Sequence, residues 1–147
     1  MTRTIAEKMF IRSGVRTYLR SGPENHLEHI GANDVNVSDS LDGEFDYVHL
    51  FAKNQEELGR QFSELKPYLG EKGALWVSWP KGGQLDTDLN LHEVIRSGYA
   101  RGLVESTCLS IDETWSALRF THPKPGKVYN NGHADLNLEA VGVGVKS

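Results

Sequence analysis

The chain has 147 residues, of which 38% are hydrophobic and 24% charged, and its formal net charge is −4. This length fits one globular domain that buries roughly 68–70% of its unfolded surface. Because the charges are of mixed sign, the sequence lacks the basic face of a nucleic-acid-binding protein, and binding to an anionic membrane surface is disfavoured for the same reason.

A single cysteine, Cys108, excludes a disulfide framework and a cysteine-based zinc site. A lone thiol of this kind is more often a core residue than a nucleophile, so we expect it to be buried. The first residues lack the apolar segment of a secretory signal, and no stretch approaches the ~20 apolar residues of a membrane span. These features predict a cytoplasmic protein.

The first elements alternate between helix and strand. Thr4 and Glu7 form a capping box that predicts a short helix. Residues 15–20 alternate polar and apolar side chains and predict a strand. Pro23 fits the first turn of a second short helix, and 35–38 predicts a brief second strand.

The middle of the chain contains the most apolar strands. Residues 45–51 are rich in aromatic and branched side chains, which favour a strand. Asn54 is suited to cap the following helix, which Gly70 is expected to end. Residues 74–79 are apolar nearly throughout, as expected for a central strand covered by helices on both faces.

The last elements predict a helix and a hairpin. Thr87 or Asp88 is expected to cap a helix that ends at Gly102. Residues 103–111 and 115–120 predict two strands whose short connection favours antiparallel pairing.

This order predicts a Rossmann-like α/β three-layer sandwich with a mostly parallel sheet and an antiparallel last strand. We assign this domain to residues 1–121. Residues 122–147 lack an apolar period and predict a flexible tail, in which Val141–Val145 is an alternative candidate for a strand added to a sheet edge of this or another copy.

Parallel strands deliver their following turns to one edge of the sheet, where α/β proteins bind ligands. We therefore expect two turns to meet at this edge, one with Trp79 and Lys81 and the other with Asp112 and Glu113. Trp79 and Trp115 could then stack on a planar ligand or on each other. The alternative is that both indoles seal the sheet edge beside a solvated rim of charges. The candidate ligand-binding residues are Trp79, Lys81, Asp112, Glu113, Trp115 and Arg119.

Familiar cofactor motifs are missing from these turns. The 79–83 turn lacks the spacing of a nucleotide-binding loop. The 21–25 turn lacks the glycines of a dinucleotide or S-adenosylmethionine loop. Asp39 could mimic a ribose-binding acid, although an exposed loop aspartate is the simpler interpretation. We therefore expect no cofactor and assign no catalytic residue.

Three histidines are candidates for metal ligands or catalytic bases. His26 and His29 lie three residues apart without a third ligand nearby, so a solvated helix surface explains them better than a metal site. His49 lies in an apolar strand and is interpreted as a hydrogen-bonded core residue. We expect no metal.

The segments LWVSWPK (75–81) and DETWSALRF (112–120) resemble a family of small bacterial proteins known only as a domain of unknown function. The resemblance covers roughly residues 4–121. More faintly, the same part of the chain resembles the later half of S-adenosylmethionine-dependent methyltransferases. It implies a methyltransferase-like fold without an established activity. The chain departs from those enzymes at the glycine-rich cofactor loop.

The sequence favours a non-catalytic domain that binds a small molecule or a protein at the carboxyl edge of its sheet. One alternative is a divergent S-adenosylmethionine-dependent methyltransferase. Another is a structural subunit that forms a homo-oligomer through its tail.

Overall fold

The computed structural model of the protein describes residues 3–124. The Val141–Val145 segment and most of the expected tail lie outside this part of the chain. Of the residues assigned to the tail, His122 is buried, and its Nε2 donates a hydrogen bond to the carbonyl of Leu69 at 3.1 Å.

The described strands form one sheet in the order β2-β1-β3-β4-β6-β5. Strands β1 to β4 pair in parallel, whereas β6 is antiparallel to both β4 and β5. The predicted mostly parallel sheet with a closing hairpin is confirmed. The strands are β1 (Arg16–Arg20), β2 (Asn36–Val37), β3 (Phe45–Phe51), β4 (Leu69–Pro80), β5 (Val104–Ser110) and β6 (Trp115–Thr121).

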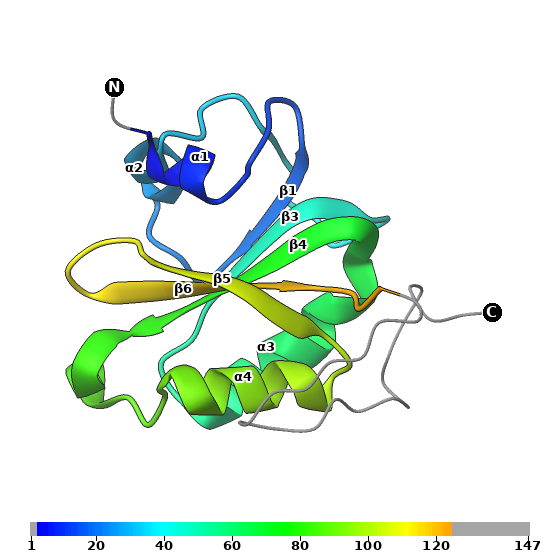
Figure 1. Cartoon of the computed structure of the whole chain (residues 1–147). Coiled ribbons are helices and arrows are strands. Elements are labelled where there is room, and N and C mark those ends of the chain that lie inside the picture. The colour runs from blue at the N-terminus through cyan, green and yellow to red at the C-terminus, as the bar shows by residue number, and fades with distance from the viewer. Residues whose placement is uncertain (1–2, 125–147) are drawn as a thin grey trace.

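Helices cover both faces of the sheet unequally (Figure 1). The short helices α1 (Ile5–Lys8) and α2 (His26–Ile30) lie on one face, and the longer α3 (Gln55–Leu65) and α4 (Leu91–Ala100) lie on the other. Two short 3-10 segments, η1 (Lys66–Tyr68) and η2 (Lys81–Asp86), flank β4.

Local polar contacts fix where the helices begin. Thr4 and Glu7 form the predicted capping box of α1, and the Asn54 side chain caps α3. The cap of α4 is Asn90, so the prediction of Thr87 or Asp88 is wrong. Asp88 accepts the backbone N–H of the first residue of α3 instead, at 2.8 Å, and thereby ties the two helices together.

Strand β4 begins at Leu69, five residues before the predicted start, and Gly70 belongs to it rather than to the end of α3. The pairing of β4 with β3 shifts register near its start. At Gly73 a Cβ atom would lie 2.6 Å from the carbonyl oxygen of Phe45. Only glycine fits this close approach of two backbones.

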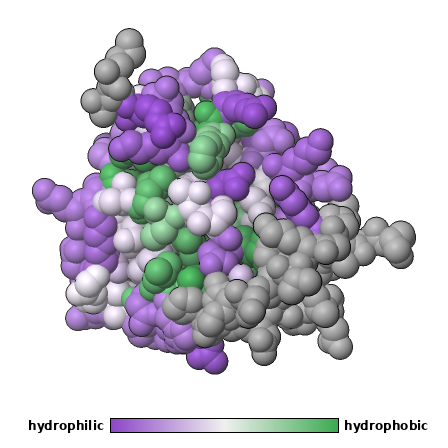
Figure 2. Space-filling view, viewed as in Figure 1, coloured by the Kyte–Doolittle hydropathy of each residue, from purple (hydrophilic) through white to green (hydrophobic). Residues whose placement is uncertain are grey.

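Successive residues of a strand point to opposite faces of the sheet, and their side chains belong to two separate hydrophobic cores. The core under α3 and α4 is the larger and includes Phe62 and Phe120, whose rings meet edge to face at 5.1 Å. The core under α1 and α2 is smaller and includes Met9 and Trp76. In the same view as Figure 1, apolar residues gather across the middle of the molecule, between the two helical layers (Figure 2).

Cys108 is exposed, which corrects the expectation of a core thiol. It lies on β5, an edge strand whose residues alternate between partly buried and exposed. Among residues 3–124, no helix has the length and apolar character needed to cross a membrane.

Candidate functional site

The segment after β4 and the β5–β6 turn, which are distant in the sequence, meet at the carboxyl edge of the sheet. Strand β4 leads into Lys81, whose Nζ donates a hydrogen bond to the backbone carbonyl of Asp112 at 2.5 Å and also contacts the Ser110 hydroxyl. The Asp112 side chain accepts the backbone N–H groups of Thr114 and Trp115, each at 2.8 Å. Lys81 and Asp112 therefore hold the β5–β6 turn in place.

The two tryptophans of the predicted site lie on opposite faces of the sheet. Trp79 is 5% exposed and belongs to the core under α3 and α4. Trp115 packs against the core under α1 and α2. The expected stacking of the two indoles, or of both on one ligand, is therefore wrong, because the antiparallel register places Trp115 opposite Pro80 and not opposite Trp79.

Of the two remaining predicted residues, Glu113 shares the β5–β6 turn with Asp112, and Arg119 does not. Glu113 is exposed, and its carbonyl accepts a hydrogen bond from the side chain of Gln84. Arg119 lies on the same face as Trp115, as the alternation predicted, but it is four residues further along β6 and away from the carboxyl edge. The structure thus brings together Lys81, Asp112, Glu113 and Trp115 at the carboxyl edge, whereas the Trp79 ring belongs to the opposite core and Arg119 lies further along β6.

A small cleft opens beside Trp115 at this edge. Its volume is about 90 Å³, which is room for about three water molecules or a ligand group of similar size. We call it the edge cleft. It is lined by Pro23, Asn25, His26, His29, Phe51, Ile111, Asp112 and Trp115.

The walls of the edge cleft combine aromatic rings with two imidazoles and the Asp112 carboxylate. The Phe51 and Trp115 rings meet edge to face, with centroids 5.1 Å apart. His29 Nε2 lies 3.1 Å from the carbonyl of Ile111 and so donates a hydrogen bond to it. Burial lowers the pKa of His26 to about 4, so this imidazole is uncharged near neutral pH.

Behind the cleft, His26 begins a buried chain of hydrogen bonds. His26 Nε2 is 2.9 Å from the Tyr47 hydroxyl, which is 2.7 Å from His49 Nδ1, and His49 Nε2 is 2.7 Å from the Ser78 hydroxyl. All four side chains are buried, and desolvation lowers the pKa of His49 well below its usual value and raises that of Tyr47. We call these residues the polar chain.

The polar chain can be hydrogen-bonded in two ways with all groups neutral. Either His26 donates to Tyr47, Tyr47 to His49 and His49 to Ser78, or every donor and acceptor role is reversed. His49 is therefore a hydrogen-bonded core residue, as predicted. The prediction of a solvated helix surface is wrong for His26, which is 2% exposed.

Sequence reasoning missed the polar chain, although a signal was present. Tyr47 and His49 are alternate residues of a strand in which only Asp46 is otherwise polar, and Ser78 interrupts the most apolar strand of the chain. Polar side chains repeated on one face of a buried strand need partners across the sheet.

The turn after β1 does not fit S-adenosylmethionine, the cofactor that a methyltransferase-like fold implies. A Cβ atom on Gly22 would lie 2.7 Å from the Phe51 ring, so the space that this glycine leaves open is filled by a core side chain. Ser21 adopts a positive φ of 65°, and Asp39 is exposed. The close backbone approach that a glycine-rich loop offers a cofactor is used here for packing.

Within residues 3–124, no group of three or more histidine, cysteine, aspartate and glutamate side chains is arranged to hold a metal ion. The edge cleft has two imidazoles and one carboxylate on its walls, but they do not form such a group.

Comparison with known proteins supports the fold. No family model matches the chain, and no curated protein matches it in sequence. Solved structures of methyltransferases do match. A TehB-like SAM-dependent methyltransferase from Corynebacterium glutamicum has a TM-score of 0.55 and 9% identity over 78% of this chain and 84% of that one.

Two further solved structures of methyltransferases match the fold of this chain. A ribosomal protein methylase from Lactobacillus delbrueckii subsp. bulgaricus has a TM-score of 0.54 and 12% identity over 78% of this chain and 72% of that one. A methyltransferase from Pyrococcus furiosus has a TM-score of 0.51 and 14% identity over 77% of both chains. At these identities the likeness defines a Rossmann-like, methyltransferase-like fold and no activity. The resemblance to a family of unknown function stays a prediction.

Proposed function

We propose that the protein is a non-catalytic ligand-binding domain built on a methyltransferase-like fold, and that it holds a small, uncharged, planar polar group in the edge cleft. The observation that carries the proposal is the convergence of four segments, from the turn after β1, α2, the end of β3 and the β5–β6 turn, on one cleft at the carboxyl edge. Open α/β sheets bind their ligands at this edge.

The chemistry of the walls supports an uncharged ligand. Neutral His26 offers a hydrogen bond without charge, and the rings of Phe51 and Trp115 supply apolar sides for a flat molecule. The Asp112 carboxylate at the cleft disfavours an anion, and one of its oxygens already accepts two backbone N–H groups. The volume of about 90 Å³ limits the enclosed part of the ligand to a small group, so a larger ligand would extend into solvent.

Burial of the polar chain favours binding over catalysis. The hydroxyls of Tyr47 and Ser78 contact histidines of the polar chain, but both side chains are buried, so neither hydroxyl is placed to act as a nucleophile on a substrate.

Nicotinamide and the purine bases are suitable probes of the cleft. Titrated into isotope-labelled protein, at least one of them should shift the indole N–H signal of Trp115 and leave that of Trp79 in place, because Trp79 lies on the other face. Asn25→Ala should weaken this binding by about tenfold, since the Asn25 side chain lines the cleft and makes no capping hydrogen bond.

Asn33→Ala, an exposed residue outside the edge cleft, is the matched control and should not alter the affinity. If none of these probes moves the Trp115 signal, the proposed ligand class is wrong. S-adenosylmethionine is titrated in parallel, because the matching structures favour a divergent methyltransferase as the second candidate. Saturable micromolar binding of S-adenosylmethionine would reverse the order of the two.

A further inference from the structure

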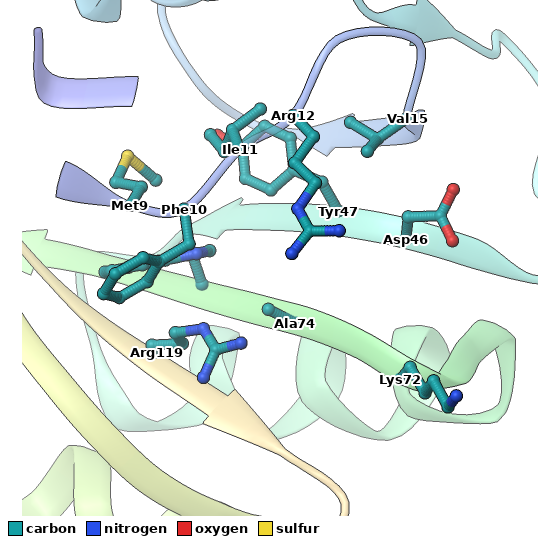
Figure 3. A pocket seen from close by; sticks show the side chains of 11 residues that line it. Met9, Phe10, Ile11, Arg12, Val15, Asp46, Tyr47, Lys72, Ala74 and Arg119 are labelled. Carbon is teal, nitrogen blue, oxygen red and sulfur yellow. The ribbon is translucent and has the colours of Figure 1, made fainter. Parts of the chain in front are cut away.

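The sheet face under α1 and α2 is covered only in part, because these helices have four and five residues. A second hollow remains on this face, about 390 Å³ in volume, between the segment after α1 and the first halves of β3 and β4 (Figure 3). This size lies in the range of sites that enclose small organic ligands. We call it the face pocket.

Basic side chains from three separate segments border the face pocket. Arg12 follows α1, Lys72 lies near the start of β4, and Arg119 lies on β6. Figure 3 shows the guanidinium groups of Arg12 and Arg119 on either side of the space above Ala74. One carboxylate, Asp46, also borders the pocket, and one of its oxygens already accepts the backbone N–H of Arg16 at 2.9 Å.

Two buried donors at the pocket have no acceptor within the described part of the chain. They are the Nε of Arg119 and the indole Nε1 of Trp76. The terminal nitrogen Nη1 of Arg119 reaches the Ser106 hydroxyl at 3.3 Å, so only part of this guanidinium is used by the protein. Buried N–H groups are nearly always paired, and two unpaired ones at a single hollow indicate a ligand that accepts hydrogen bonds there.

The apolar wall of the pocket contains a residue in an unusual conformation. Phe10 has a positive φ of 62° and is 60% exposed, and its ring centroid lies 5.7 Å from the Arg119 guanidinium carbon. A bulky residue rarely adopts this backbone conformation, and such outliers cluster at ligand sites. The conformation holds an aromatic ring over the pocket that packing does not bury.

We infer that the face pocket binds an organic anion, in which a carboxylate or phosphate group accepts hydrogen bonds from Arg119 and Trp76 and an apolar body packs against Phe10. An excess of basic over acidic side chains favours the negative charge, and a guanidinium matches the geometry of both oxyanions. Burial lowers the pKa of Arg119, and an anion at this place would offset that cost. This site is independent of the edge cleft.

Three compounds test whether binding to the face pocket depends on the charge of the ligand or only on its shape: benzoate, phenyl phosphate and benzamide. Titrated into the full chain, benzoate or phenyl phosphate should bind saturably at millimolar concentration or below and shift the indole N–H signal of Trp76 without moving that of Trp115. Benzamide, an uncharged analogue of benzoate, should bind at least about tenfold more weakly. Added salt should weaken the binding of both anions.

Substitutions at the basic side chains test which residues of the face pocket bind the anion. Arg119→Gln should reduce the affinity for the anion by about tenfold or more, and Arg12→Gln, at an exposed position, should reduce it severalfold. Arg60→Gln is the matched control, because this exposed arginine lies on α3 on the other face. Absence of saturable binding by both anions, equal binding of benzamide, or a shift at Trp115 in place of Trp76 would overturn the inference.

Discussion

Acid should destabilise this protein well before its carboxylates are protonated, because two histidines are buried in neutral form. His26 has a pKa near 4 in the folded protein against 6.5 for the free side chain, and the pKa of His49 is also lowered by burial. Between these pKa values the unfolded chain binds more protons than the folded one. Stability is therefore full above about pH 6.5 and falls as the pH is lowered toward 4.

The size of the effect follows from the pKa of His26. The difference corresponds to about 3 kcal/mol of unfolding free energy in total, and about 2 kcal/mol of this is lost between about pH 7 and about pH 5. His49 adds to the loss in the same direction. For a domain of this size, whose whole stability is roughly 5–15 kcal/mol, the change is large.

Urea unfolding, followed by tryptophan fluorescence at a series of pH values, measures this dependence. His26→Gln removes one titrating group, so its stability should fall less steeply with decreasing pH than that of the unmodified chain, whatever its absolute stability. Asn33→Ala, at an exposed position whose side chain does not titrate, should leave the slope unchanged. A stability that is flat or rising as the pH falls, or an unchanged slope in His26→Gln, would refute the reasoning.

Further predictions concern packing and exposure. Gly98→Ala should destabilise the protein by about 1–3 kcal/mol in chemical unfolding, because its Cβ would lie 2.1 Å from the buried ring of Phe120. The matched Gly59→Ala meets only the guanidinium of Arg101, a side-chain end that can shift, and should cost less than Gly98→Ala; a larger loss there than at Gly98 would contradict the account. Trp115→Ala should cost about 1–3 kcal/mol, less than the ~3–5 of a fully buried tryptophan, because Trp115 is only partly buried and borders the edge cleft. Cys108 should react with a thiol reagent in the folded protein, more slowly than a free thiol at neutral pH because burial raises its pKa, and complete protection without denaturant would show that it is not exposed.

Local signals in the sequence predicted the positions of most elements. The Thr4 capping box, the Asn54 cap and the aromatic and branched residues of 45–51 depend on neighbours within a few residues, and all three elements are found as expected. The cap of α4 was misplaced because Asp88, an equally good capping residue, bonds to α3, which is distant in the sequence. A choice between two competent caps depends on tertiary contacts that local spacing does not contain.

The candidate site was harder to predict for the same reason. The chain order indicated that the turns at Lys81 and Asp112 meet, and they do. The relative faces of Trp79 and Trp115 depend on the register of β4 and β6, in which a shift of one residue exchanges the two sides of a strand. The burial of His26 depends on α2 lying over Tyr47, and no local pattern reports that contact.

The three tryptophan indole N–H signals test the central claim most directly, since Trp115 borders the edge cleft, Trp76 borders the face pocket and Trp79 lies in the opposite core. Nicotinamide or a purine base should shift the Trp115 signal alone, and S-adenosylmethionine should shift none of the three. A saturable shift at Trp115 with micromolar S-adenosylmethionine would contradict the account, because it would show that the turn at Gly22 accepts the cofactor despite the Phe51 ring packed against it.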